Sequence, residues 1–284
     1  MDLIFRKVPQ KAVDLEVIRD FIEDEHPKRI HFATYHRNAL RRVEGKENVV
    51  GRLVLPFNEP FDSIARKCLS MDSFLFASRF GNGYYRQIFS EIEFLQVESF
   101  IEKVKNLVFL RDTLDLSVAL SMHETEPGIR TPLGEHEFRV KYRSDSSDVS
   151  ADKSALAVEM QRRLEELPYF KFADYICAIP SRKPFMKEII GSLKGFDFVD
   201  ISNQMDWENK SGSLKDVATA EEKLDMIQSW GLRFGEDMDL NGKTVLLVDD
   251  MYQSGVTLQY IAMRMKEVGA KRVFGMTLVK SLGN

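Results

Sequence analysis

The sequence has few cysteines, little net charge and no long apolar run. Its 284 residues include two cysteines, Cys68 and Cys177, which cannot form a metal cluster on their own. So few cysteines exclude a disulfide scaffold and favour a reduced, intracellular compartment. No apolar stretch approaches the roughly 20 residues that span a membrane, so no membrane segment is expected. The net charge of -4 gives no support for nucleic-acid binding by bulk charge.

Internal repeats and low-complexity segments are also absent from the sequence. Asp2 and further charged residues within the first ten positions argue against a signal peptide, so we expect a cytoplasmic protein. Hydrophobic residues make up 44% of the chain, which is enough to bury a sizeable core. At this length the chain can hold one large domain or two.

The most informative stretch is residues 245–257, VLLVDDMYQSGVT. Its apolar residues 245–248 predict a buried parallel strand, which Asp249 and Asp250 close. A turn of small and hydroxyl residues follows at 254–257. After the turn, apolar residues recur at helical spacing on one face, namely Leu258, Ile261, Ala262, Met265 and Val268. The stretch therefore predicts a strand, an acidic pair, a glycine loop and the start of a helix.

The order of these features has chemical consequences. Ligands of open α/β sheets lie beyond the carboxyl ends of the strands. A loop of small residues that enters a helix turns several N–H groups toward one point, where the helix dipole also favours an anion. Ser254 and Thr257 add hydroxyl donors, and Gly255 lets the backbone come close. We therefore expect a cradle for one phosphate, preceded by carboxylates that can accept hydrogen bonds from two ribose hydroxyls or hold a metal-bound water.

This arrangement resembles the phosphoribosyl pyrophosphate (PRPP) motif of type I phosphoribosyltransferases, in which an apolar run, two acidic residues and three variable positions precede Ser/Thr-Gly-x-Thr. The resemblance implies an α/β fold, with a parallel sheet flanked by helices, over residues 116–284. It implies that Asp249 and Asp250 are catalytic and hold the ribose hydroxyls. It also implies that Mg²⁺ enters with PRPP, bridged to these carboxylates by water rather than bound directly. The residues implied to bind the 5-phosphate of PRPP are Gln253, Ser254, Gly255, Val256 and Thr257.

Other interpretations of the stretch explain less of it. A Walker B strand also ends in acidic residues, but the chain has no G-x-x-x-x-G-K-[ST] partner. A response-regulator receiver carries its acidic pair early in its domain. An ordinary strand whose Asp250 caps a helix explains one carboxylate and leaves the Ser-Gly-x-Thr spacing to chance.

A second predicted strand end supplies cationic side chains. Residues 175–179 predict a buried strand, and a helix is expected over 185–193. Ser181, Arg182 and Lys183 lie between them and should reach the same edge of the sheet as the acidic pair. Two cations there can neutralise a diphosphate, and the corresponding loop of phosphoribosyltransferases binds pyrophosphate. The alternative is a surface loop that is basic by chance.

The rest of the second domain is predicted from local patterns. The turn at 131–134 should feed an alternating strand over 136–142, followed by a polar loop at 143–152 and a helix over 154–167. Residues 200–242 form a polar, charged linker. Phosphoribosyltransferases have a mobile loop in this interval that closes over PRPP. Lys223 and Arg233 are candidates for its catalytic side chain by position only.

Within this superfamily the sequence is most similar to the ComF-like phosphoribosyltransferases. The supporting features are TPLG at 131–134 with Lys141-Tyr142, Ile-Pro-Ser at 179–181, and DDMY at 249–252. The chain departs from hypoxanthine-guanine phosphoribosyltransferases at Gln253, where those enzymes carry an Asp proposed to act on the purine. Because an amide cannot exchange a proton at neutral pH, salvage of a 6-oxopurine by that route is not expected.

Residues 1–115 form an additional N-terminal domain, mixed and largely helical, whose role the sequence does not define. Helices are expected over 13–25, 62–76 and 85–107, and strands at 3–5 and 49–55. One local feature is a basic segment at 28–46, which contains Lys28, Arg29, His31, His36, Arg37, Arg41, Arg42 and Lys46. This segment can be a contact face for a nucleic acid or protein partner. A solvated basic face, offset by nearby acidic residues, is the interpretation we favour.

Three functional hypotheses follow from the sequence. The first is an enzyme of the phosphoribosyltransferase type, in which a nucleophile displaces pyrophosphate from ribose C1 of Mg-PRPP. The second is a regulator that senses PRPP or a ribose 5-phosphate nucleotide without chemistry. The third is the effector subunit of a toxin or defence assembly, which a partner restrains through the N-terminal domain. A homo-oligomer or a complex subunit is expected, and fold-level likeness does not decide between these hypotheses.

Overall fold

The computed structural model describes residues 12–24, 29–31, 40–55, 76–77, 84–143, 149–171 and 173–283. A seven-stranded sheet organises this part of the chain, with the strand order β1-β6-β7-β15-β14-β10-β11. From β7 to β11 every neighbouring pair is parallel, whereas β1 and β6 join antiparallel at one edge. In chain order these strands are β1 (Arg29–His31), β6 (Val108–Leu110), β7 (Leu116–Met122), β10 (Tyr175–Ala178), β11 (Val199–Asp200), β14 (Thr244–Tyr252) and β15 (Arg272–Lys280).

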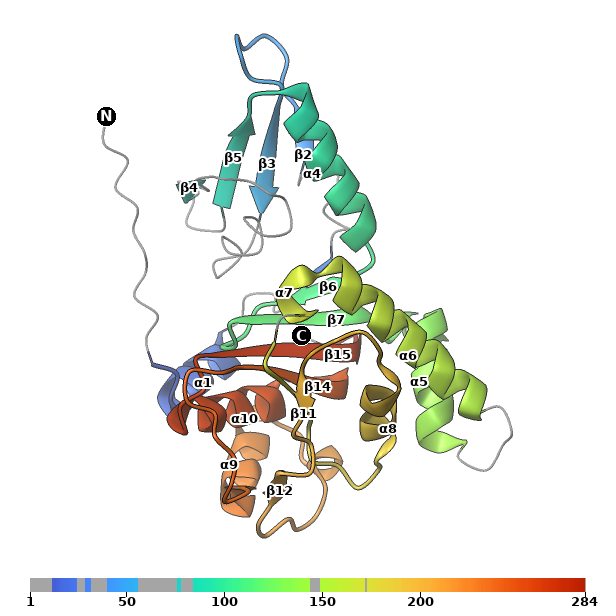
Figure 1. Cartoon of the computed structure of the whole chain (residues 1–284), viewed down its shortest axis with the longest axis vertical. Coiled ribbons are helices and arrows are strands. Elements are labelled where there is room, and N and C mark those ends of the chain that lie inside the picture. Colours follow the sequence, from blue (N-terminus) through green and yellow to red (C-terminus); the bar gives the residue numbers. More distant parts are fainter. Residues whose placement is uncertain are drawn as a thin grey trace.

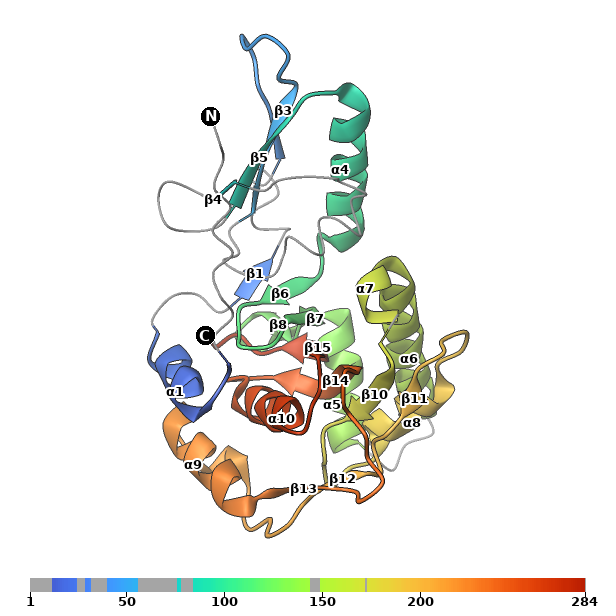
Figure 2. The ribbon, with the colours of Figure 1, turned by 60° about the vertical axis from the view of Figure 1, so that its left-hand side comes forward.

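Helices cover both faces of this sheet. Alternate residues of β14 enter different cores, since Leu246 and Val248 belong to one apolar cluster and Val245 and Leu247 to the other. The first face packs against α5 (Pro132–Tyr142), α6 (Val149–Glu166) and α8 (Phe185–Ser192), and the second against α1 (Leu15–Glu23), α9 (Ala220–Trp230) and α10 (Val256–Glu267). Figures 1 and 2 show these two layers on either side of the strands. The predicted α/β class, with a mostly parallel sheet flanked by helices, is confirmed.

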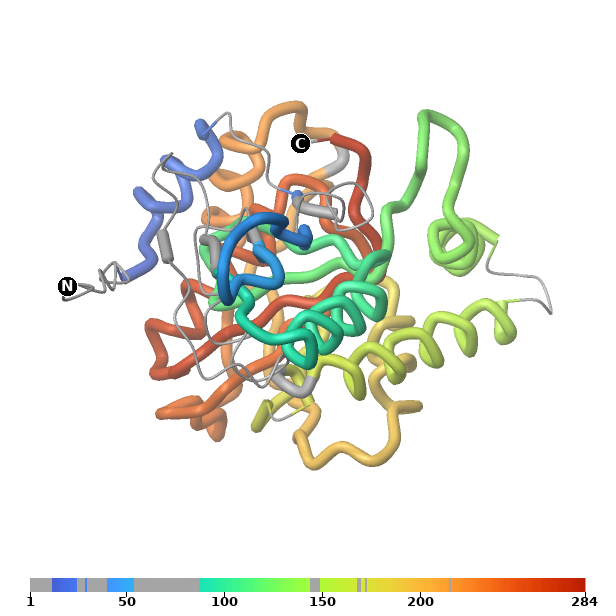
Figure 3. Tube along the Cα trace, turned by 90° about the horizontal axis from the view of Figure 1, so that it is seen from above, coloured from blue at the N-terminus to red at the C-terminus, as the bar shows by residue number. Residues whose placement is uncertain are grey.

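A second, smaller sheet lies in the N-terminal part of the chain. It is antiparallel with the order β2-β3-β5-β4, and its strands are β2 (Leu40–Arg42), β3 (Gly51–Leu55), β4 (Phe76–Ala77) and β5 (Tyr84–Ile88). The helix α4 (Glu91–Val104) follows β5 and leads back to the large sheet (Figure 1). Seen from above in Figure 3, this helix runs over the other elements of the fold.

The N-terminal predictions are met in part. The helix expected over 13–25 is α1, and the strand expected over 49–55 is β3. The single helix expected over 85–107 is wrong at its start, because β5 reaches Ile88 and Ser90 then caps α4 by accepting a hydrogen bond from the Glu93 N–H. The strand at 3–5 and nearly all of the helix at 62–76 lie outside the described residues.

The strand predicted over 136–142 is wrong, because these residues form the helix α5. Thr131 is its N-cap and accepts a hydrogen bond from the Gly134 N–H at 3.0 Å, while Pro132 occupies the first helical position. Both are helix-start signals that outweigh the alternation of apolar residues in the segment. A hairpin of β8 (Glu124–Glu126) and β9 (Ile129–Arg130) precedes α5, and the short helix α7 (Pro168–Lys171) follows α6. The next long helix, α6, also begins earlier than predicted, at Val149.

The polar segment over 200–242 is more ordered than a linker. It holds an antiparallel pair, β12 (Met205–Trp207) and β13 (Leu232–Phe234), a 3-10 turn η1 (Leu214–Asp216) and the helix α9. Thr219 starts α9 with a reciprocal capping box to Glu222. The two tryptophans of the segment pack edge to face with ring centres 5.5 Å apart, which gives it an apolar centre of its own.

The large sheet extends across the predicted domain boundary. Both β1 and β6 precede residue 115, yet they pair with each other and with β7. The division of the chain at residue 115 stays a prediction. Within the described residues, no helix combines the length and the apolar character needed to cross a membrane.

Candidate functional site

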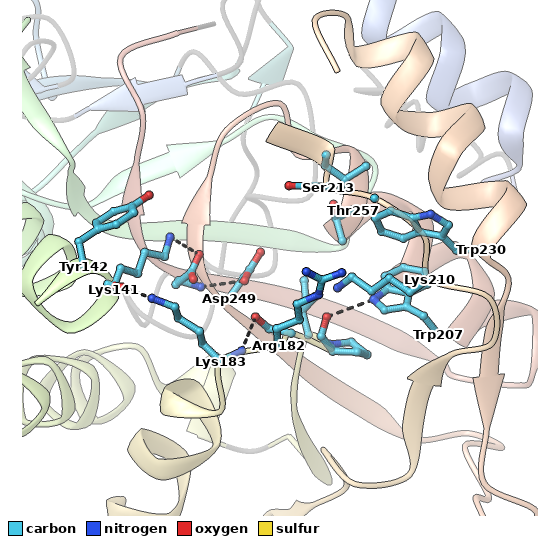
Figure 4. A pocket seen from close by; sticks show the side chains of 16 residues that line it. Lys141, Tyr142, Arg182, Lys183, Trp207, Lys210, Ser213, Trp230, Asp249 and Thr257 are labelled. Carbon is cyan, nitrogen blue, oxygen red and sulfur yellow. Dashed lines mark hydrogen bonds and ion pairs between the residues drawn. The ribbon is translucent and has the colours of Figure 1, made fainter. Parts of the chain in front are cut away.

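The candidate site lies where β10 ends beside β14. Ala178 is in register with Val248, so the segment that follows β10 lies beside the last residues of β14 and the loop after them. They enclose a cavity of about 360 Å³, whose wall includes residues 180–183 of one segment and Asp249, Asp250 and Thr257 of the other. Figure 4 shows the side chains that converge there. The structure thus brings the predicted basic loop and the predicted acidic pair together.

A smaller cavity of about 110 Å³ adjoins the first one. Residues 253–257 form much of its wall, together with Lys223 from α9 and Thr277 from β15. Asp249 and Thr257 line both cavities. The acidic pair therefore lies between a small pocket formed by the helix-entry loop and a larger pocket bordered by cations, which is the order of groups that a ribose with a phosphate on each side requires.

The acidic pair has unusual electrostatics. Asp249 accepts a hydrogen bond from the Asp250 N–H at 2.9 Å. Burial, followed by the charge of the neighbouring Asp250, raises the pKa of Asp249 above its ordinary value. A carboxyl in this position binds a proton more readily than an exposed one. A cation or hydroxyl donor of a ligand that stabilises the charged form therefore interacts more strongly with this carboxylate than with an exposed one.

Lys141 is a site residue to which the sequence analysis assigned no role. Its Nζ lies 2.9 Å from Asp250 Oδ1 and 2.6 Å from Glu137 Oε1, and the Glu137 side chain is 0% exposed. Burial alone would lower the pKa of Lys141, but these carboxylates outweigh it and hold that pKa above its ordinary value. On the far side, His123 Nε2 lies 3.5 Å from Glu137 Oε2. The helix α5 therefore holds a permanent positive charge against the acidic pair.

Four cationic side chains face the larger cavity. Lys183 donates its Nζ to the carbonyl of Lys141, and its N–H donates to Ser181 Oγ at 3.3 Å. Burial and the nearby Arg182 guanidinium lower the pKa of Lys210. In the described part of the chain, neither Arg182 nor Lys210 forms an ion pair with a carboxylate. Cationic side chains that lie together without such partners bind a ligand with more than one negative charge more strongly than a ligand with a single charge.

The helix-entry loop has a backbone that only glycine adopts easily. Gly255 has φ +73°, and a Cβ there would overlap the hydroxyl of Tyr252. That hydroxyl donates to Asp112 Oδ2 at 3.2 Å. On another side, Lys280 donates to the carbonyl of Gln253 at 3.3 Å. The loop is thus fixed from below by Tyr252 and β15, and its shape depends on Gly255.

Trp207 and Trp230 form an aromatic wall of the larger cavity. Trp207 donates from its indole N–H to the Pro180 carbonyl at 3.1 Å, which ties β12 to the basic loop. Trp230 donates in the same way to the Ser211 carbonyl at 2.8 Å, and Lys210 lies over its ring at 5.3 Å. Sequence patterns do not reveal this wall, because it depends on pairing of β12 with β13 across more than twenty residues of chain.

The remaining predicted residues have different outcomes. Val256 is buried as the first residue of α10. Arg233 is exposed on β13 and lines neither cavity. In the basic segment at 28–46, Arg29 donates to the Leu282 carbonyl at 2.6 Å and Arg42 pairs with Glu91 at 2.9 Å. Lys28, His36 and Arg37 lie outside the described residues, so the partner hypothesis for this segment stays a prediction.

The side chains at the cavity fit a Mg²⁺ that arrives on the ligand. Asp249 and Asp250 offer carboxylate oxygens, the donors that Mg²⁺ prefers, and a diphosphate supplies more of them. No group of three or more His, Cys, Asp or Glu side chains within the described residues could hold a metal ion by itself. The two carboxylates would therefore hold the ion only together with a phosphate ligand.

Comparison with known proteins agrees with this geometry. Residues 183–282 match the family model described as the phosphoribosyl transferase domain, which is the type I family. The match covers the chain from Lys183 through α8, the acidic pair, the helix-entry loop and β15. The helix α5, with Lys141, precedes it. No curated protein matches the chain.

Proposed function

We propose that this protein binds Mg-PRPP and transfers its phosphoribosyl group to an acceptor, with release of pyrophosphate. The observation that carries the proposal is the position of Asp249 at the junction of two cavities, one formed by the helix-entry loop and one bordered by Arg182, Lys183 and Lys210. In PRPP the ribose lies between a 5-phosphate and a diphosphate, so each part of the ligand has a matching part of the site. We also assign the domain to the ComF-like branch, on the sequence features at 131–134, 141–142 and 179–181.

Each group of residues would have a defined part in the reaction. Asp249 and Asp250 would accept hydrogen bonds from the ribose 2- and 3-hydroxyls, and residues 253–257 would hold the 5-phosphate. Arg182 and Lys183 would bind the diphosphate. Magnesium bound with PRPP supplies charge neutralisation for the leaving group. The bond from ribose C1 to the diphosphate oxygen breaks and a bond from C1 to the acceptor forms. The acceptor's proton leaves to the released pyrophosphate or to solvent.

The protein would act mainly by positioning and by electrostatics. Positive charge builds up on the ribose ring as the diphosphate leaves, and the carboxylates beside the ring stabilise that charge. Lys141 offsets part of the negative charge of the acidic pair while the site is empty of ligand, which lets two carboxylates lie together in a partly buried position. The aromatic wall formed by Trp207 and Trp230 would exclude water, which otherwise competes with the acceptor for the ribose.

Calorimetric titration with PRPP and Mg²⁺ tests the proposal. Wild-type protein should bind, and the double variant Asp249→Asn/Asp250→Asn should bind at least about a hundredfold more weakly, because two charged hydrogen-bond acceptors are lost. The variant Asp237→Asn/Asp239→Asn, which neutralises two exposed carboxylates outside the site, is the matched control and should bind like wild type. Equal binding by the site variant and the control would refute the proposal.

Release of pyrophosphate separates this proposal from the other hypotheses. A transferase that has bound PRPP should release pyrophosphate when an acceptor is added. A regulator should bind PRPP and leave it intact under every condition. An effector subunit restrained by a partner should release pyrophosphate only after the partner has dissociated.

A further inference from the structure

Gln253 makes contacts that the PRPP motif does not account for. Its side-chain Oε1 accepts a hydrogen bond from Lys223 Nζ at 3.5 Å, and its main-chain carbonyl accepts one from Lys280 Nζ at 3.3 Å. Two lysines from different elements, α9 and β15, thus meet at one residue of the helix-entry loop. Because an amide oxygen is neutral, these contacts orient the lysines without cancelling their charge.

Lys223 faces the smaller cavity. It is partly buried on α9 and lines that cavity together with residues 253–257. In the part of the chain that the structure describes, Lys223 Nζ has no carboxylate within ion-pair distance, and its contact is with Gln253. The other charged side chain on the wall of this cavity is Asp249, at the junction with the larger one. Lys223 therefore supplies a positive charge, without an ion-pair partner among the described residues, at a cavity lined by a helix N-terminus.

A second observation at the same cavity points to a ligand. Thr277 lies on β15 opposite Asp249, is 1% exposed and lines the cavity. Its hydroxyl oxygen is buried without a hydrogen-bond partner in the described structure. A buried hydroxyl in that state is destabilising unless a bound group satisfies it. An anionic oxygen in the cavity would accept the hydrogen bond of Thr277 and lie near the ammonium of Lys223.

We propose that Lys223, held over the helix-entry loop by Gln253, binds the 5-phosphate of the ligand, and that Thr277 donates to the same phosphate from the floor of the cavity. The inference rests on the proposed function, and it adds Lys223 and Thr277 to the residues that would hold the 5-phosphate. Gln253 is a positioning residue, because its side chain holds Lys223 and would act on the phosphate only through that lysine.

Titration of the full-length protein with two simple probes tests this inference. Ribose 5-phosphate should occupy the smaller cavity, and inorganic pyrophosphate with Mg²⁺ should bind beside Arg182 and Lys183. Lys223→Met should weaken ribose 5-phosphate binding about tenfold, the loss expected for one partly exposed charged hydrogen bond, and change pyrophosphate binding less than twofold. Thr277→Val, of nearly equal volume, should weaken ribose 5-phosphate several-fold. Lys271→Met, which removes an exposed lysine outside both cavities, is the matched control and should change neither.

A separate variant tests whether Gln253 positions Lys223. Gln253→Glu should pair Lys223 with a carboxylate and place a negative charge beside the phosphate, so it should weaken ribose 5-phosphate more than Lys223→Met does. A lysine that only stabilises the fold would lower the thermal unfolding midpoint and weaken both probes alike. That result, or unchanged ribose 5-phosphate binding in Lys223→Met, would overturn the inference.

The outcomes also separate this inference from the proposed function. If wild-type protein binds neither ribose 5-phosphate nor PRPP, the proposed function fails and this inference fails with it. If wild-type protein binds both ligands and Lys223→Met binds each of them as tightly as wild type does, only the proposed role of Lys223 is refuted.

Discussion

At the scale of single residues, Asp112 shows how the site depends on groups beneath it. It lies on the connection between β6 and β7, accepts a hydrogen bond from the Leu114 N–H at 3.0 Å, and accepts a second one from the Tyr252 hydroxyl. Burial raises its pKa to about 6, although these hydrogen bonds act in the opposite direction. Because Tyr252 supports Gly255, the charge state of Asp112 is linked to the shape of the helix-entry loop.

The raised pKa of Asp112 predicts a specific pH dependence of stability. The pKa is higher in the folded protein than the ordinary value near 3.9, so the folded state holds the proton more tightly. This contribution to stability is complete below about pH 4 and is lost as the pH rises through 6. Asp112→Asn cannot lose a proton. The free energy of unfolding, measured from pH 4 to 8, should therefore shift in favour of the variant as the pH rises, by about 2–3 kcal/mol in total. Parallel profiles for wild type and variant would contradict the prediction, and the exposed Asp197→Asn serves as control.

Sequence reasoning found the site residues that lie next to one another in the chain. Asp249, Asp250 and residues 253–257 form one contiguous motif, and residues 180–183 follow a recognisable strand. It assigned no part in the site to Lys141 and Lys210, since their place depends on how α5 and the segment after β12 pack against β14. A signal for Lys141 was present, because Glu137 and Lys141 are four residues apart and pair along one helix face. It becomes visible only when residues 132–142 are treated as a helix.

At the scale of elements, the segment from β14 to α10 could be predicted because its signals are local. The apolar run, the small residues and the helical spacing are all consecutive in the sequence. The acidic pair does not close the strand, however, since β14 continues to Tyr252. The strands β12 and β13 were missed for the opposite reason. Each has three residues, and such short strands are stable only when paired and packed, here around Trp207 and Trp230.

Gly255 tests the connection between β14 and α10. In Gly255→Ala the new Cβ would meet the Tyr252 hydroxyl, and the residue would keep a positive φ. Loss of about 2–3 kcal/mol in the free energy of unfolding is expected, because backbone strain adds to the displaced hydroxyl. Gly242→Ala is the matched control: it also has φ +72° but no atom within 4 Å of its Cβ, so it should cost only about 1 kcal/mol. Urea denaturation measures both, and equal losses would show that Tyr252 moves aside freely.

At the scale of the whole molecule, the N-terminal part contributes to the large sheet. The side chains of Val108 and Leu110 in β6 enter one core, and Phe109 enters the other. Arg29, the first residue of β1, donates to the Leu282 carbonyl, and the Lys280 ammonium lies among the carbonyls of the same C-terminal segment. The strand β1 and the C-terminal segment therefore lie side by side, next to the helix-entry loop, which the sequence pattern alone does not show.

This arrangement predicts how truncated chains behave. A chain that begins at residue 116 loses β6 and leaves β7 as an open sheet edge. A chain that begins at residue 105 keeps β6, so we expect it to unfold at a clearly higher temperature and to aggregate less. Circular dichroism melts and light scattering measure the two properties. Equal stability of the two chains would instead support a domain that starts at residue 116.

The strand order also has a consequence for synthesis of the protein. The centre of the large sheet is β15, between β7 and β14, and it is the last strand of the described chain. Ribosomes add roughly 5–20 residues per second, so β7 waits on the order of ten seconds or more before its parallel neighbour emerges. During that time β7 has β6 on one side and an open edge on the other. We therefore expect the nascent chain to depend on chaperones that shield this edge, and its yield to fall when synthesis outpaces them.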